Sequence, residues 1–286
     1  MKKKILVTGA NGQLGKTIAS IKNEFLEIDF IFTSSSQLNI ANQKQVAAFF
    51  KENQIDWCIN CAAYTAVDTA ESEAEKANLV NVIGVKNLVN ACALHGVKCI
   101  HISTDFVFNG LQTIPYQETD ATNPQSVYGK TKLEGEQIIT NHLESYFIIR
   151  TSWLYSVFGN NFVKTMIRLA KEKEKLQVVN NQIGSPTYAL DLARFIMHIV
   201  QNNSTNYGLY HYSNQGEISW YTFAKSIFEM SNITIKLEPI KSVNYPTPAK
   251  RPAYSVLNTT KARNTFAIEI PFWKESLKQV IKSIHE

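Results

Sequence analysis

Apolar and polar residues follow a strand–helix rhythm along the first half of the chain. Short apolar runs alternate with longer stretches in which apolar residues recur at helical spacing. Near-continuous apolar strands between helices indicate a parallel sheet covered on both faces, and hence a doubly wound α/β fold. Strands are expected within residues 3–10, 29–34, 56–63, 98–104 and 146–153, and helices within residues 13–23, 41–53, 74–96 and 128–143.

The rhythm changes after residue 152, where amphipathic helices and isolated strands follow without regular order. The sequence therefore predicts a first domain over residues 1–152 and a smaller C-terminal α+β lobe over residues 153–286, whose elements have room to interleave with the sheet. In the lobe, helices are expected within residues 160–176, 189–202, 219–231 and 273–286, strands within 176–189 and 208–214, and a proline-rich loop over 245–252.

The longest predicted helix, residues 74–96, carries an apolar stripe and ends at a glycine, Gly96, which suits a helix C-terminus. The chain has no run that approaches the ~20 apolar residues of a membrane-spanning helix, so no membrane association is expected. The stripe is expected to contain Leu79, Val82, Val85, Leu88 and Val89.

Composition and charge argue against nucleic acid as a partner, and the N-terminal residues argue against secretion. Hydrophobic residues make up 44 % of the 286 residues and charged residues 19 %, as in an ordinary globular enzyme. The net charge of +5 is scattered, which suits a small anionic ligand better than nucleic acid. Only "ILV" follows the lysines at positions 2–4, too short for the apolar core of a signal peptide, so a cytoplasmic location is predicted.

Four cysteines raise the question of a metal site or a disulfide. Cys58 and Cys61 form a C-x-x-C within a predicted strand, and Cys92 and Cys99 follow. Side chains three positions apart on a strand point to opposite faces, so Cys58 and Cys61 are not expected to share a metal. The four thiols are interpreted as small buried apolar groups, and no metal is predicted.

A glycine-rich turn directly follows the first predicted strand. Gly9, Gly12 and Gly15 form G-x-x-G-x-x-G at the start of a helix. In such a turn the first glycine permits the tight bend, the second lets the backbone approach a pyrophosphate, and the third lets helix and strand pack closely. The pyrophosphate then lies at the helix N-terminus. The pattern predicts a Rossmann-type dinucleotide-binding domain.

A second pattern lies at the start of the helix predicted over residues 128–143. Tyr128 and Lys132 are four residues apart and therefore share one face of that helix. Without the glycine turn, a surface pair would be the simplest interpretation. Together with that turn, a phenol and an ammonium on one face indicate catalysis.

Several collinear motifs resemble one family. G-x-x-G-x-x-G, Y-x-x-x-K and the hydroxyls of "STDFVFNG" are similar to extended short-chain dehydrogenases/reductases. The match narrows with "AAYTAVDTAESE", "RTSWLY", "GNNFVKTMIRLAKE", "QIGSPTYALDLA" and "RPAYSVLNTTK", which resemble the dTDP-4-dehydrorhamnose reductase family from about residue 4 to the last helix. The implied reaction is reduction of the 4-keto group of a dTDP-linked 6-deoxysugar to dTDP-L-rhamnose.

The resemblance implies a catalytic triad of Thr104, Tyr128 and Lys132. Hydride transfer to a ketone requires protonation of the carbonyl oxygen, and Tyr128 is expected to supply the proton. The Lys132 ammonium is expected to lower the tyrosine pKa and to hold the nicotinamide ribose. Thr104, rather than its neighbour Ser103, is expected to donate a hydrogen bond to the same oxygen.

The resemblance also assigns binding residues. Asn39 stands where the family usually has an acid near the adenine, and Phe106 where it commonly has tyrosine, so one hydroxyl contact is missing. The substrate-binding residues are expected to be Thr104, Asp105, Phe106, Tyr128, Trp153 and Arg251. The cofactor-binding residues are expected to be Gly9, Asn11, Gly12, Gln13, Leu14, Gly15, Ser34, Asn39, Ile40, Ala62, Ala63, Tyr64, Thr65, Tyr128 and Lys132.

The loop after the second predicted strand bears on cofactor choice. NAD-selective domains place an acid there, about 20 residues beyond the glycine turn, which repels the 2′-phosphate of NADP. This chain has Thr33 followed by serines 34–36, with no acid before Glu52 and no basic residue before Lys44. NADPH is therefore expected to be moderately preferred, with NADH still usable.

Two alternatives come from other functional classes. A sugar-nucleotide dehydratase or epimerase of the same superfamily is one; dehydratases carry an acidic pair after the threonine, whereas "TDFV" has only Asp105. A regulatory subunit that binds NADP without turnover is the other, but such relatives tend to lose part of the hydroxyl–Tyr–Lys set. The sequence leaves the oligomeric state open between monomer and homodimer.

Overall fold

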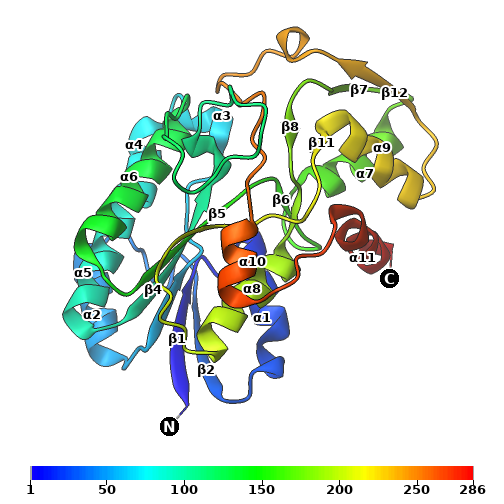
Figure 1. The fold of residues 1–286 in the computed structure, drawn as a ribbon. Coiled ribbons are helices and arrows are strands. Elements are labelled where there is room, and N and C mark those ends of the chain that lie inside the picture. The colour runs from blue at the N-terminus through cyan, green and yellow to red at the C-terminus, as the bar shows by residue number, and fades with distance from the viewer. Residues whose placement is uncertain (1, 286) are drawn as a thin grey trace.

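The computed structural model describes residues 2–285, in which a six-stranded parallel sheet forms the centre of the molecule (Figure 1). Its strand order is β10-β5-β4-β3-β1-β2, so the doubly wound sheet predicted from the sequence is confirmed. The strands are β1 (Lys3–Thr8), β2 (Ile28–Thr33), β3 (Trp57–Asn60), β4 (Lys98–Thr104), β5 (Tyr146–Thr151) and β10 (Gly208–His211).

The strand order reverses at β1, which pairs with β2 on one side and β3 on the other. In open parallel sheets, ligands bind beyond the carboxyl ends of the strands at such a reversal. The carboxyl ends of β1 and β3 therefore mark the expected ligand site.

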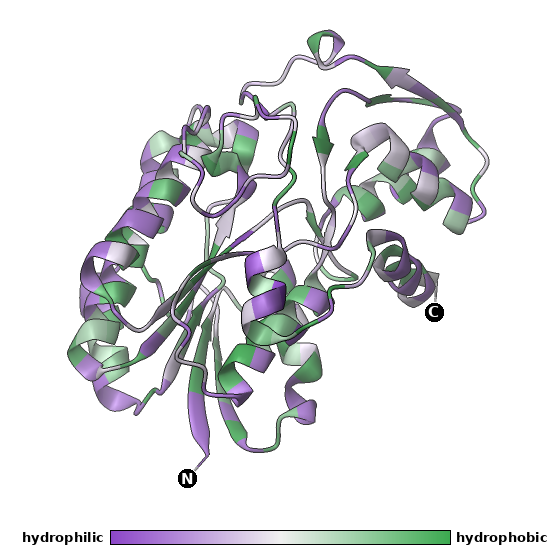
Figure 2. Cartoon of the chain, viewed as in Figure 1, coloured by the Kyte–Doolittle hydropathy of each residue, from purple (hydrophilic) through white to green (hydrophobic). Residues whose placement is uncertain are grey.

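Helices cover both faces of the sheet. One face is covered by α1 (Gln13–Ile21), α8 (Ala189–Gln201) and α10 (Thr260–Phe266), and the other by α2 (Gln43–Glu52), α5 (Val85–His95) and α6 (Val127–His142). In Figure 2 these outer helices carry both hydrophobic and hydrophilic residues, as amphipathic helices do.

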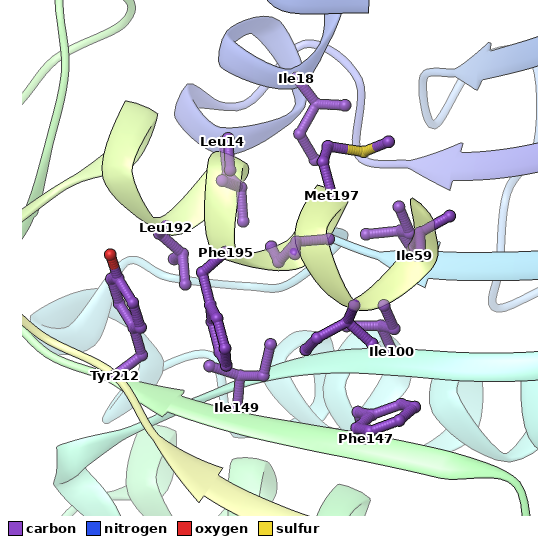
Figure 3. Close-up of a cluster of buried hydrophobic side chains, with 14 of the residues drawn as sticks. Leu14, Ile18, Ile59, Ile100, Phe147, Ile149, Leu192, Phe195, Met197 and Tyr212 are labelled. Atoms are coloured by element: carbon purple, nitrogen blue, oxygen red, sulfur yellow. The ribbon is translucent and has the colours of Figure 1, made fainter. Parts of the chain in front are cut away.

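Two hydrophobic cores lie on either side of the sheet because side chains alternate along each strand. Ile5 and Val7 of β1 belong to the core under α1 and α8, whereas Leu6 belongs to the core under α2 and α5. Figure 3 shows the first core, in which Leu14 of α1 and Leu192 of α8 lie above the strands.

The C-terminal lobe has a core of its own, in which Phe223 and Trp273 are buried. Its helices are α7 (Phe162–Glu172), α9 (Trp220–Met230) and α11 (Trp273–His285). Its short strands pair as β6 (Leu154–Tyr155) with β9 (Thr187–Tyr188), β8 (Ile183–Gly184) with β11 (Ile218–Ser219), and β7 (Lys175–Val179) with β12 (Lys236–Ile240).

The lobe and the sheet exchange elements. The segments α8, β10 and α10 follow residue 152 in the chain, yet β10 pairs with β5 and α8 packs on α1. We therefore propose that the two units, residues 1–152 and 153–286, interleave at the sheet rather than meet at one linker.

The segment predicted as one regular helix over residues 74–96 is broken by a π-helical turn. After α3 (Val67–Ala70), α4 (Ala74–Asn78) leads into the π-helical Leu79–Gly84 and then α5, which ends at Gly96 with a φ of +66°. The π turn changes which side chains face inward. Placing Leu79 in the buried stripe was wrong: it is 48 % exposed, while Asn81 is buried.

The same segment corrects the expectation about membrane-spanning runs. Within the described residues, Ala74–His95 is one helical stretch of 22 residues that is long and apolar enough to cross a membrane by length and composition alone. More than half of its most apolar window, 56 %, is buried inside the protein. A helix in the core of a globular protein passes the same test, so the stretch is weak evidence for a membrane segment.

Candidate functional site

The glycine turn between β1 and α1 is shaped by close backbone contacts. Gly9 has a φ of +66°, and a Cβ there would lie 2.6 Å from the backbone nitrogen of Ala62. A Cβ on Gly15 would lie 2.5 Å from the carbonyl oxygen of Gly9. Gly12 begins α1 without a side-chain cap, so the first N–H groups of the helix face outward, where a phosphate can bind.

A groove of about 350 Å³ lies beside this turn, at the reversal of strand order. Its lining residues are uncharged. The uncapped helix N-terminus beside the groove suits the pyrophosphate of a dinucleotide. The predicted cofactor residues that line the groove are Gly9, Asn11, Gly12, Ser34, Asn39, Ile40, Ala62, Ala63 and Tyr64; Ser35, Leu38, Cys61 and Val80, which the sequence did not single out, also line it.

Six predicted cofactor residues lie outside this lining, and two of them, Tyr128 and Lys132, lie on α6. Leu14 is buried in the core, and Thr65 is exposed. Gly15 packs against the glycine turn. The side chain of Gln13 points toward the lobe, where its Oε1 accepts hydrogen bonds from the Ser156 hydroxyl (3.1 Å) and from Asn161 Nδ2 (3.0 Å). Of Gln13 and Leu14, only the backbone is therefore left for a pyrophosphate.

Three predicted catalytic and substrate residues meet where β4 ends and α6 begins. The Thr104 hydroxyl hydrogen-bonds the phenol of Tyr128 and accepts a hydrogen bond from the backbone N–H of Phe106 at 3.2 Å. The Phe106 ring lies edge-on to Tyr128, with 5.6 Å between ring centroids. A Cβ on Gly129 would lie 2.3 Å from the carbonyl oxygen of Phe106, so glycine permits this close approach. The Ser103 hydroxyl points elsewhere and donates to Glu136.

The pKa of Tyr128 moves opposite to the sequence-based expectation. Burial raises it to about 12; the hydrogen bond with Thr104 lowers it, and the nearby Asp105 charge raises it further. The Lys132 side-chain nitrogen does not offset this, because it donates to the carbonyl oxygen of Ile102 at 2.7 Å. The prediction that Lys132 lowers this pKa is wrong for this arrangement, because its head group turns toward β4.

Asp105 is the most unusual carboxylate of the site. It is only 2 % exposed, its Oδ1 accepts a hydrogen bond from Thr104 at 3.0 Å, and its Oδ2 has no partner among the described residues. Burial raises its pKa to about 6; the nearby Ser255 hydroxyl, which is not in hydrogen-bonding geometry with Oδ2, and the Thr104 hydroxyl lower it. An unpartnered buried oxygen is costly, so this acceptor suits a ligand hydroxyl.

Trp153 is held rigidly just after β5. Its backbone lies in the left-handed region, with a φ of +46°, and its indole stacks on Trp220 with ring centroids 3.4 Å apart. A second neighbour is also close, because a Cβ on Gly184 would lie 2.6 Å from the indole. A strained residue between two close neighbours is typical of ligand sites, because the surroundings must impose the conformation.

Arg251, predicted to reach the substrate diphosphate, is engaged elsewhere. Its two terminal nitrogens bind the carboxylate oxygens of Asp68 at 2.8 and 2.7 Å. The backbone N–H of Ala249 donates to the same carboxylate at 3.2 Å, so the pair ties the proline-rich loop to α3. Arg251 would have to leave or share Asp68 in order to bind a diphosphate.

Comparisons with known proteins agree with this geometry. The model of the family described as RmlD substrate binding domain matches residues 2–286. A dTDP-4-dehydrorhamnose reductase of Aggregatibacter actinomycetemcomitans is 41 % identical, with 97 % of this chain and 98 % of the relative covered. The crystal structure of a dTDP-4-dehydrorhamnose reductase from Clostridium acetobutylicum has a TM-score of 0.95 and 44 % identity, covering 99 % of this chain and 100 % of that one.

The chain belongs to the dTDP-4-dehydrorhamnose reductase family. The resemblance predicted from the motifs is thereby confirmed over nearly the whole length. Another member, from Bacillus anthracis and solved in complex with NADP, has a TM-score of 0.94 and 41 % identity, covering 99 % of this chain and 100 % of that one.

In the present chain, the motifs did not reveal the residues that position the site. Asn81, from the π turn, accepts a hydrogen bond from the Tyr64 backbone N–H at 2.9 Å and donates to the Thr131 hydroxyl at 3.1 Å. It thereby fastens one wall of the groove to α6. Asparagine inside an apolar helix was the available signal, because a polar side chain there needs a partner.

A buried ion pair also holds α6 in place. Arg150 of β5 binds both carboxylate oxygens of Glu136, at 2.9 and 2.6 Å, and Glu136 also accepts from the Ser103 hydroxyl. The two residues are 14 positions apart in sequence, and the sequence gave no signal of the pair because their meeting depends on the packing of α6 on the sheet. The pair fixes α6 relative to β4 and β5.

The cysteines lie on both faces of the sheet, as the strand geometry predicts. Cys58 belongs to the core under α5, whereas Cys61 packs against the opposite core. Cys58, Cys92 and Cys99 are buried free thiols. Among residues 2–285, no group of three or more His, Cys, Asp or Glu side chains is arranged to hold a metal ion.

Proposed function

We propose that the protein is a dTDP-4-dehydrorhamnose reductase, which reduces the 4-keto group of dTDP-4-dehydro-6-deoxy-L-mannose to dTDP-L-rhamnose. Family membership over nearly the whole chain supports this substrate. The observation that carries the chemistry is the meeting of the Thr104 and Tyr128 hydroxyls beside the unpartnered Oδ2 of Asp105. Donors for a carbonyl oxygen and an acceptor for a sugar hydroxyl are thus side by side.

The groove beside the glycine turn would hold the cofactor, which we propose to be NADPH, with NADH usable. The relative from Bacillus anthracis that was solved with NADP supports this choice. The backbone of residues 12–15 would bind the pyrophosphate, and Ala62, Ala63 and Tyr64 would border the nicotinamide half. When bound, the cofactor supplies the hydride that reduces the keto carbon.

Tyr128 would donate its phenolic proton to the carbonyl oxygen. With a pKa of about 12, it is fully protonated at neutral pH, and an ammonium turned toward it would lower that pKa and make it the stronger acid. Thr104, whose hydroxyl donates to Asp105 Oδ1 in the protein alone, would turn its proton to the same oxygen and share the developing negative charge. Lys132 would act from the cofactor side of Tyr128, once its head group turns away from β4.

The substrate sugar and its nucleotide would be held by residues around these hydroxyls. Asp105 would accept a hydrogen bond from a sugar hydroxyl, and Phe106 and Trp153 would pack against apolar surface of the ligand. Arg251 would bind the diphosphate through paired hydrogen bonds in exchange for Asp68. We further propose a cytoplasmic location and either a monomer or a homodimer in solution.

One assay separates the functional classes. Purified protein incubated with dTDP-L-rhamnose and NADP⁺ should produce NADPH, measured by its absorbance, because the reductase reaction is reversible. A regulatory subunit would bind NADP⁺ without producing NADPH. A dehydratase or epimerase would convert a different nucleotide sugar and produce none from dTDP-L-rhamnose, and either result would overturn the proposal.

A further inference from the structure

His101, in the middle of β4, links the end of β3 to the catalytic lysine. It is 1 % exposed, and both ring nitrogens have a partner at 3.0 Å: Asn60 Nδ2 faces Nδ1, and Lys132 Nζ faces Nε2. Asn60 lies directly beside His101 in the pairing of β3 with β4. A buried imidazole between an amide and an amine must be assigned donors and acceptors consistently.

The amide of Asn60 is oriented by two other donors. Its Oδ1 accepts from the Thr8 hydroxyl at 2.7 Å and from the backbone N–H of Ala62 at 3.1 Å. A backbone N–H can only donate, so turning the amide over would bring two donors together. Nδ2 therefore donates to Nδ1 of His101, which must be unprotonated, and the single hydrogen of a neutral imidazole lies on Nε2.

That hydrogen points at Lys132. An ammonium has three donors and no lone pair, so it cannot accept from Nε2–H, whereas a neutral amine can. The amine also donates to the carbonyl oxygen of Ile102 at 2.7 Å. Protonating His101 instead would place a second hydrogen against Asn60 Nδ2, and burial lowers the pKa of His101 well below its usual value. The complete set of hydrogen bonds is thus that of an uncharged Lys132.

We propose that His101 is a positioning residue, which holds Lys132 as a neutral amine in the protein alone and releases it, with uptake of one proton from solvent, when the nicotinamide cofactor binds. The inference rests on the cofactor binding of the proposed function. The proton adds to the Nζ lone pair, so the bond from Nε2–H is lost. The ammonium is then free to turn toward Tyr128 and the cofactor.

The surroundings of Lys132 favour the neutral form. Burial lowers its pKa to about 8, while the charges of Glu136 and Cys61 act in the opposite direction. The Glu136 charge is already paired with Arg150, and burial raises the pKa of the Cys61 thiol, which keeps it uncharged. The titratable groups that act directly on Lys132 are Cys61 after β3, His101 on β4 and Glu136 on α6. Arg150 on β5 pairs with Glu136, and Asp105 at the end of β4 acts on Tyr128 of α6.

Calorimetry of NADP⁺ binding measures the proton directly. At pH 8, the binding enthalpies measured in Tris and in phosphate differ by the number of protons exchanged multiplied by the difference in buffer ionisation enthalpy. With a lysine pKa of about 8, uptake of about half a proton is expected, falling toward zero at pH 6.5. The 2′-phosphate of NADP⁺ is already ionised at pH 8, because its pKa is about 6.

Two variants assign the proton. Lys132→Met should bind NADP⁺ more weakly, because it lacks the ammonium proposed to hold the nicotinamide ribose, and without proton uptake. His101→Gln places an amide near the Nε2 position, and its carbonyl oxygen accepts from an ammonium, so Lys132 is charged beforehand and the uptake is lost while binding persists. A residue that served packing alone would leave the proton count unchanged.

The outcomes are separable. Binding of NADP⁺ by the wild-type protein without uptake at pH 8 overturns the inference, whatever the folding of the variants. So does uptake that persists in His101→Gln or in Lys132→Met. Failure of the wild-type protein to bind NADP⁺ at all counts against the proposed function and, with it, against this inference.

Discussion

The proposed cofactor groove and the proposed catalytic floor meet at the same edge of the sheet, yet they are built by opposite means. The groove is lined by backbone, glycine, alanine and uncharged polar residues. The floor, formed by Thr104, Asp105, Tyr128 and Lys132, consists of buried polar and ionisable side chains, and burial shifts three of their pKa values. Shape therefore governs the groove, whereas desolvation governs the floor.

The difference has a consequence for how each region responds to substitution. A change in the groove acts through steric contact, so it should alter cofactor affinity and stability without affecting the chemical step. A change on the floor removes a proton donor or a buried charge, so it should alter turnover or the pH dependence of stability. Substitutions in the two regions should thus separate cleanly in kinetic and folding measurements.

The largest effect is expected on the floor, at Tyr128. Tyr128→Phe removes the proton donor but keeps the ring that packs against Phe106, so kcat should fall roughly 10²- to 10⁴-fold. The Kd for NADP⁺, measured by fluorescence titration, should stay within about twofold, because the groove is untouched. Turnover close to that of the wild-type protein would show that another group supplies the proton.

The next largest effect is expected in the groove, at Gly9. An alanine there must adopt a left-handed backbone conformation, and its Cβ would lie 2.6 Å from the backbone nitrogen of Ala62. Gly9→Ala should therefore weaken NADP⁺ binding roughly 10- to 100-fold. Gly96 provides a matched control, because it has the same φ of +66° but nothing within 4 Å of a Cβ.

Comparison of the two alanine variants isolates steric contact from backbone strain. Denaturant unfolding should show Gly9→Ala about 1–3 kcal/mol less stable than Gly96→Ala, with NADP⁺ affinity unchanged in the control. Equal losses of stability in both variants would mean that backbone strain alone accounts for the need for glycine at position 9, and that the turn has room for a side chain.

Sequence spacing was informative wherever local geometry decides. The positions of the sheet strands, the glycine turn and the shared face of Tyr128 and Lys132 follow from periodicity and glycine chemistry, and the structure has α6 over Val127–His142. Spacing could not give the partner of Lys132, because His101 reaches it only through the packing of α6 on β4.

Other features depended on tertiary contacts for the same reason. The π turn brings Asn81 inward, where its backbone oxygen would lie 2.6 Å from a Cβ at Gly135 of α6, and neither helix alone specifies that contact. The raised pKa of Tyr128 is an effect of burial, which a pair of residues on a helix does not reveal. Local patterns thus located the site, but not its electrostatics.

A smaller effect is expected for the stability of the floor at Asp105. Its pKa in the folded protein, about 6, lies above the unfolded value of 3.8, so the folded state binds the proton more tightly. The associated stability is fully present below pH 3.8 and is lost as the pH rises through 6. Two pKa units correspond to about 3 kcal/mol at most.

Asp105→Asn removes that pH dependence. The variant should be about 2–3 kcal/mol more stable than the wild-type protein at pH 7.5, with the advantage shrinking between pH 6 and pH 4, because an amide carries no buried charge. Denaturant unfolding at several pH values measures this, and turnover should fall at the same time. A stability difference that does not vary with pH would indicate that Asp105 titrates normally.

The smallest effect is expected for cofactor choice, which tests whether the groove is as free of charge as its lining indicates. The loop after β2 offers the 2′-phosphate neither a carboxylate that repels it nor a cation that binds it, and the Ser34 hydroxyl already donates to Gln37 Oε1 at 2.9 Å. Neutral hydrogen bonds contribute less than charged ones, so the kcat/KM ratio should favour NADPH by about 1–2 kcal/mol.

Ser35, exposed at the groove, gives the sharper test: Ser35→Asp should repel the phosphate and reverse the preference, whereas Ser35→Asn should keep it. Steady-state kinetics with both cofactors at one substrate concentration measures the ratio. A tenfold advantage for NADH in the wild-type protein would mean that the loop after β2 excludes the phosphate by shape, and that steric contact alone governs this end of the groove.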